Sequence, residues 1–233
     1  YGTDAVGCVI NMMSHEPTRP FEGDMWLSGG TVGALDGGVR PGGRWKQLTM
    51  FADLELHHID AYTLLPQDQS TMGANATRYD GLIKLRYQLT PRAAFSFSGN
   101  AYHNDANGKA TDYTGTATSG YNRAYSSDST QNYAVTGDFL PTNTTVIQTR
   151  FYTGRYDENS HQKTLATDGT VGTSQLDYGN LYERYHRADT TISQQMGVWN
   201  FLQGGFEWAQ DNYRGLNRLV DGDVLGVVDI VGD

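Results

Sequence analysis

The feature that most constrains this fold is the alternation of apolar and polar residues. Within Trp45 to His58, every second residue from Leu48 to Leu56 is apolar, and the residues between them are polar with the exception of Phe51; the apolar set is Leu48, Met50, Ala52, Leu54 and Leu56. Successive side chains of a strand point to opposite faces, so this pattern predicts a strand with one apolar face. The same period predicts strands at 79–89, 93–104, 131–139, 144–156 and 200–213. Further strands are expected at 182–195, where neither parity is clean, at 224–231, and as two short strands within the Gly-rich stretch 23–41. A helical period is almost absent.

The expected connections between these strands are of two kinds. Short segments with Pro or Gly predict tight turns, at 40–44, 90–92, 141–143 and 197–199. Long polar segments, expected to be loops, occupy roughly 60–78, 105–130 and 157–181. Several such loops are unusual in a compact soluble domain but typical of an outer-membrane barrel, whose short turns face the periplasm. The sequence therefore predicts an all-β fold, an antiparallel transmembrane β-barrel.

Composition and motifs exclude several classes of function. The net charge of −9 and a pI near 5.0 argue against a nucleic-acid partner. Cys8 is the only cysteine, which excludes an intramolecular disulfide and a multi-cysteine zinc site. Neighbouring His57 and His58 would point to opposite faces of a strand and so cannot share one ion. No nucleophile elbow or phosphate loop occurs, so we expect no enzyme, no catalytic residue and no cofactor. The histidines show no metal-ligand spacing, so we expect no metal, while calcium at the acidic stretches 157–159 and 221–223 stays open.

The first thirteen residues carry a motif. They resemble the end of the plug domain of TonB-dependent outer-membrane receptors, where Tyr-Gly-(Ser/Thr)-x-Ala-x-Gly-Gly-Val-(Ile/Val)-Asn precedes the first barrel strand. The matching residues are Tyr1, Gly2, Thr3, Ala5, Val6, Gly7, Val9, Ile10 and Asn11. Cys8 departs from the second glycine of the family pattern, and Met12-Met13 from its usual Ile or Val.

The resemblance implies a division of the chain and a function. Residues 1–20 would be the end of the plug and 21–233 the N-terminal part of the barrel. The family barrel has about 22 strands, so we expect a fragment that supplies about nine or ten. The intact protein would sit in the outer membrane of a Gram-negative bacterium, in contact with its lipid. There it would take up a scarce ligand, such as an iron–siderophore complex or cobalamin, driven by the TonB complex through a plug region absent here.

The expected loop 105–130 supplies the candidate ligand-binding residues. Tyr combines a rigid apolar ring with a hydroxyl, and a guanidinium pairs with anions. The candidates are Tyr113, Tyr121, Arg123 and Tyr125. Two other functions stay open: a passive porin-like barrel, against which the plug-like segment counts, and a secreted β-sandwich that binds carbohydrate through loop tyrosines.

Overall fold

The computed structural model describes residues 16–63, 74–114, 117–165, 171–219 and 224–231, with side chains described for 16–63, 74–109, 123–161 and 180–215. Ten strands form one sheet. They are β1 Glu22–Gly29, β2 Leu35–Trp45, β3 Leu48–Ile59, β4 Asn75–Thr90, β5 Ala93–Thr114, β6 Ala117–Phe139, β7 Thr145–Leu165, β8 Val171–Met196, β9 Asn200–Leu219 and β10 Val224–Val231.

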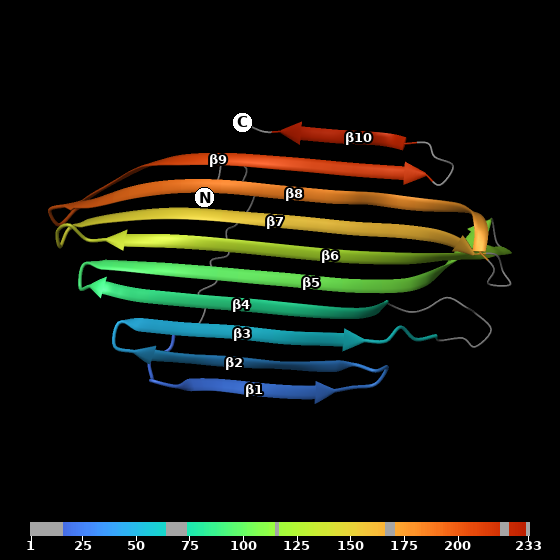
Figure 1. The fold of residues 1–233 in the computed structure, drawn as a ribbon, viewed down its shortest axis with the longest axis horizontal. Coiled ribbons are helices and arrows are strands. Elements are labelled where there is room, and N and C mark those ends of the chain that lie inside the picture. Colours follow the sequence, from blue (N-terminus) through green and yellow to red (C-terminus); the bar gives the residue numbers. More distant parts are fainter. Residues whose placement is uncertain (1–15, 64–73, 115–116, 166–170, 220–223, 232–233) are drawn as a thin grey trace.

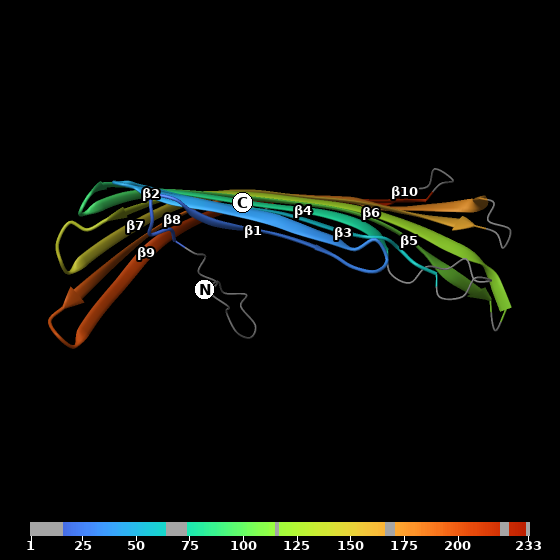
Figure 2. The same ribbon diagram turned by 90° about the horizontal axis from the view of Figure 1, so that it is seen from below.

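The strands follow one another across the sheet in chain order (Figure 1). Each strand pairs antiparallel with its sequence neighbours, as in the register that joins Leu54 of β3 to Val39 of β2 and Gly81 of β4. The predicted all-β antiparallel fold is therefore confirmed. β1 and β10 lie at opposite edges of the sheet, which is curved, so that the ends of several strands bend towards one side (Figure 2). An open, curved meander of this kind is consistent with part of a β-barrel.

Three of the four predicted tight turns are confirmed. They join β4 to β5 at Pro91-Arg92, β6 to β7 at 141–144, and β8 to β9 at 197–199, where Gly197 has a φ of 73°. The prediction of a turn at 40–44 is wrong, because β2 runs through these residues. The chain turns instead at Lys46-Gln47, with Lys46 in the left-handed region at a φ of 52°.

The expected long loops at 105–130 and 157–181 are also corrected. β5 and β6 stay paired from Ala93 and Phe139 out to Thr114 and Ala117, and β7 and β8 continue to Leu165 and Val171. The five strands β5 to β9 are 20 to 26 residues long. Polar residues on both sides of a strand hide its period in the sequence, but water can solvate both faces while the backbone ladder continues.

The two faces of the sheet differ in chemistry. One face, here called the belt face, carries Val39 and Leu54, which lie directly opposite each other, and most of the exposed large apolar side chains of the later strands. These are Ile83, Tyr87, Leu89, Phe95, Val135, Phe139, Phe151, Ile192, Leu202, Phe206 and Trp208. The other face, here called the polar face, carries most of the ion pairs described below. A conventional core between two layers is therefore not part of the described architecture.

The segment before β1 covers part of the polar face. Pro17 is fully buried, and Phe51 is 9% exposed. A Cβ built on Gly42 would lie 2.7 Å from Cγ of Pro17 and 3.4 Å from Cδ2 of Phe51, so the proline packs on β2 beside this ring. The one apolar residue that breaks the alternation of β3 is thus covered by Pro17.

Candidate functional site

An ion-pair network on the polar face of β2 and β3 is the first candidate site. The guanidinium of Arg40 donates from Nε to Asp53 Oδ2 at 3.0 Å and from Nη2 to Glu55 Oε1 at 2.6 Å. The same guanidinium lies 4.2 Å from the centre of the Trp26 ring on β1. Strand alternation brings these groups together, because Trp26, Arg40 and Asp53 all point to the polar face from adjacent strands.

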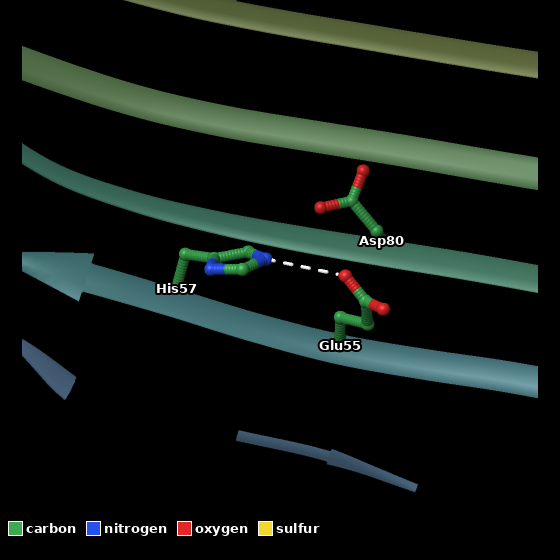
Figure 3. Close-up of side chains that lie close together, drawn as sticks. All are labelled: Glu55, His57 and Asp80. Carbon is green, nitrogen blue, oxygen red and sulfur yellow. Dashed lines mark hydrogen bonds and ion pairs between the residues drawn. The ribbon is translucent and has the colours of Figure 1, made fainter. Parts of the chain in front are cut away.

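His57 extends this network across the sheet (Figure 3). Its Nδ1 lies 2.6 Å from Asp36 Oδ1, and its Nε2 lies 3.3 Å from Glu55 Oε2. His58, the next residue, instead contacts Thr77 Oγ1 at 2.8 Å through its Nδ1. Thr77 is the register partner of His58 and lies on the belt face. The prediction that the two histidines point to opposite faces is therefore confirmed.

Glu55, His57 and Asp80 are the described residues that could hold a metal ion together. One ligand atom from each lies within 4.8 Å of the others. Each of these residues already has a protein partner, however: Glu55 binds Arg40, His57 binds Asp36, and Asp80 accepts from Nε of Arg78 at 2.7 Å. A cation here would compete with two guanidinium groups, so the arrangement is that of an ion-pair network.

The same kind of contact continues across β4 to β9. Arg86 donates to Asp138 at 3.2 Å, and Gln148 donates to the other oxygen of that carboxylate at 2.9 Å. Arg150 donates from Nε to both oxygens of Asp189, each at 3.1 Å. Asp189 is buried, at 9% exposed. These contacts join residues up to 52 positions apart in the chain. They connect β4 to β6 across β5, and β6 to β7 and β7 to β8, along the polar face.

A cavity of about 270 Å³ lies between the N-terminal segment and strands β3 to β5 and is lined by both. Its lining combines Glu16 and Pro17 with Thr49, Phe51, Lys84 and Arg86, among others. The chain before β1 therefore contacts the polar face close to the turns that join the strands. Residues Tyr1, Gly2, Thr3, Ala5, Gly7 and Asn11 of the plug-like motif lie outside the described residues.

The predicted ligand-binding residues lie on strands rather than on a loop. Tyr113 belongs to β5, whereas Tyr121, Arg123 and Tyr125 belong to β6; the side chains of Tyr113 and Tyr121 lie outside those described. By strand alternation, Arg123 and Tyr125 lie on the same face as Val135, the belt face. They are further from the turn than the apolar residues of that face. The structure brings Tyr125 together with Asp105, by an O–H···O bond of 3.1 Å, and with His161, at 4.8 Å between rings. Ligand binding by the four residues stays a prediction.

Asp105 and Tyr156 lie beyond the apolar part of their strands, and both have shifted pKa values. Hydrogen bonds from Ser127, His103 and Tyr125, that of Ser127 foremost, hold the pKa of Asp105 below its ordinary value against the opposing effect of burial. Burial, together with the neighbouring Glu158 carboxylate, raises the pKa of Tyr156 to about 12. Both groups therefore keep one charge state across neutral pH, Asp105 ionised and Tyr156 protonated.

Sequence reasoning missed the Arg40 network because it assigned 40–44 to a turn. A strand that continues through Pro41 and a turn at Lys46-Gln47 are both needed to place Arg40 opposite Asp53, and the sequence signalled neither.

Comparison with known protein families found no match, and comparison with curated proteins found none either. Among the described residues, no helix is long and apolar enough to cross a membrane.

Proposed function

We propose that this chain forms part of the wall of an outer-membrane β-barrel, and that the intact protein is a TonB-dependent receptor that takes up a scarce ligand. The exposed apolar side chains of the belt face are the observation that supports insertion into a membrane. Leu54, Phe95 and Phe206 are 53%, 53% and 73% exposed there, while the opposite face holds charged side chains in ion pairs. Lipid would cover such an apolar face, and water would fill the polar side.

The strand lengths support this assignment. A tilted strand of about 10 residues crosses the hydrocarbon core of a bilayer. In β5 the apolar residues of the belt face begin at Phe95, and polar residues such as His103 and Asp105 follow further from the turn. Because β5 to β9 have 20 residues or more, each would cross the membrane near its turn and project beyond it with the rest.

Two observations favour a receptor over a passive porin. The resemblance of Tyr1–Met13 to the end of a plug is the first. The second is that Glu16 and Pro17 lie on the polar face, which would line the barrel interior where a plug belongs. In this proposal the partners are outer-membrane lipid, the TonB complex and a ligand of the iron–siderophore or cobalamin class.

Uptake by cells that carry the full-length gene tests the proposal. The probes are ⁵⁵Fe loaded on siderophores from the organism's own iron-starved medium, and ⁵⁷Co-cyanocobalamin. We expect uptake of one probe to stop when the gene is deleted, when TonB is inactivated, or when a protonophore removes the proton gradient. Uptake that persists without TonB would favour a porin. Recovery of the protein from the soluble fraction without detergent would favour the secreted sandwich, and insertion without uptake of either probe would contradict the ligand class.

A further inference from the structure

Charge is divided unequally between the two faces of the sheet. Over the described side chains of β4 to β9, the acidic residues on the belt face are Asp105 and Asp157, against the cations Lys109, Arg123, Arg155, Arg184 and Arg214. The polar face over the same strands holds eight acidic residues against the five cations Arg78, Lys84, Arg86, Arg150 and Arg187; the acidic residues are Asp80, Asp128, Asp138, Glu158, Glu183, Asp189, Glu207 and Asp211. The net charge of −9 therefore conceals a cationic part of the belt face.

The densest cationic group surrounds Tyr182 on β7 to β9. Arg155 and Arg184 are direct cross-strand partners, and Tyr182 is the partner of Arg214. The guanidinium carbons of Arg155 and Arg184 lie 5.4 Å and 5.6 Å from the centre of the Tyr182 ring. We call Arg155, Tyr182, Arg184 and Arg214 the arginine patch.

The charges of this patch are only partly compensated within the chain. Arg155 is paired with Asp157, through an Nη2–Oδ1 contact of 2.9 Å. In the described part of the chain, neither Arg184 nor Arg214 has a carboxylate within ion-pair distance, and both are exposed. Like charges placed directly opposite on a sheet destabilise it, so the Arg155–Arg184 pair would be stabilised by an external anion.

The patch lies just beyond the apolar part of the belt face. In β7 it follows Phe151, and in β9 it follows Phe206 and Trp208. Arg155, Arg184 and Arg214 stand 10, 12 and 14 positions from the turn-side ends of their strands at Thr145, Met196 and Asn200. Since about 10 residues cross the hydrocarbon core, this is the height of the lipid head groups on the side away from the turns.

We propose that the arginine patch binds the phosphorylated head group of a glycolipid in the outer leaflet. This inference depends on the membrane part of the proposed function. Guanidinium groups match phosphate oxygens with paired N–H donors, and cations at this height attract anionic head groups. The Tyr182 hydroxyl adds a donor for the sugar.

Lipid binding by the full-length protein, purified from outer membranes in detergent and stripped of lipid, tests this assignment. The probe is diphosphoryl lipid A, with dephosphorylated lipid A and inorganic phosphate in parallel, and bound lipid is measured by native mass spectrometry. We expect the double variant Arg184→Gln/Arg214→Gln to bind diphosphoryl lipid A about 10- to 100-fold more weakly. Arg92→Gln, which removes one arginine charge from an exposed turn at the other end of the strands, should bind normally.

Three results would overturn the assignment. These are equal binding by the double variant, equal binding of dephosphorylated lipid A, or equal competition by inorganic phosphate, which would indicate a simple phosphate site. Heat-resistant migration of each variant on gels shows that it has folded. If the wild-type protein inserts and folds but binds no lipid A, only this inference fails. If it does not insert at all, the proposed function fails first.

Discussion

Leu54 and Glu55 are neighbours in β3 and meet opposite surroundings. Leu54 is 53% exposed on the belt face, opposite Val39. Glu55 accepts a hydrogen bond from Nη2 of Arg40 at 2.6 Å on the polar face. The two residues therefore distinguish the face that lipid would cover from the face that would line the interior.

Leu54→Arg should impair assembly of the barrel more than Glu55→Gln. An arginine on the lipid face near the middle of the membrane costs about 2–4 kcal/mol. Glu55→Gln keeps the side-chain size and one acceptor, and the loss of a partly solvated ion pair costs about 1 kcal/mol or less. The free energy of unfolding of the full-length protein, from urea titrations read by heat-resistant migration, compares the two. The reverse order would mean that the faces are assigned wrongly.

Gly38→Ala should destabilise the protein, whereas Gly81→Ala should not. A Cβ at Gly38 would lie 2.8 Å from the backbone oxygen of Leu54 and would press on the Trp26 ring. At Gly81 the nearest atom is the flexible Cδ2 of Leu54, at 3.5 Å. We expect a loss of about 1–3 kcal/mol for the first variant and a change within about 0.5 kcal/mol for the second.

Urea titration checks these values, and the fluorescence of Trp26 should change in the Gly38 variant alone. Equal stability of the two variants would contradict the close packing of Trp26 on β2.

Arg150→Met should destabilise the protein through the carboxylate that it leaves behind. Asp189 is 9% exposed and accepts both contacts from Arg150 Nε. Because Arg150 itself is half exposed, we expect a loss of about 1–3 kcal/mol, below that of a fully buried pair. Adding Asp189→Asn should restore part of it, and the matched control Arg78→Met, beside the more exposed Asp80, should lose less. No recovery in the double variant would show that Arg150 acts by packing instead.

Single cysteines in a Cys8→Ser background should reveal the orientation of the strands. Ser119 belongs to β6 near its N-terminal end, whereas Asn143 lies in the turn between β6 and β7. In intact cells that carry the full-length receptor, an impermeant maleimide should label a cysteine at Ser119 and not one at Asn143. Labelling of Asn143 alone would reverse the topology and move the arginine patch to the periplasmic side.

Proline and glycine predicted the turns correctly only where they act on the backbone alone. Pro91 and Gly197 lie in turns as expected. Gly42 and Gly43 do not, because they allow a close approach instead: Cγ of Pro17 stands 2.7 Å from the place where a Cβ of Gly42 would be. The true turn at Lys46-Gln47 carries no glycine or proline, so local chemistry contained no signal for it.

The sequence by itself determined the class of fold and the faces of the strands, because alternation is a local property of extended backbone. The opposite surroundings of Leu54 and Glu55 follow from it directly. Only the tertiary structure decided which strands extend and which charges meet. The stretch around Arg123 and Tyr125 lacks an apolar period, and its strand is stabilised by a ladder to residues far along the chain. Arg150 and Asp189 are 39 positions apart, and only the register of β7 against β8 brings them together.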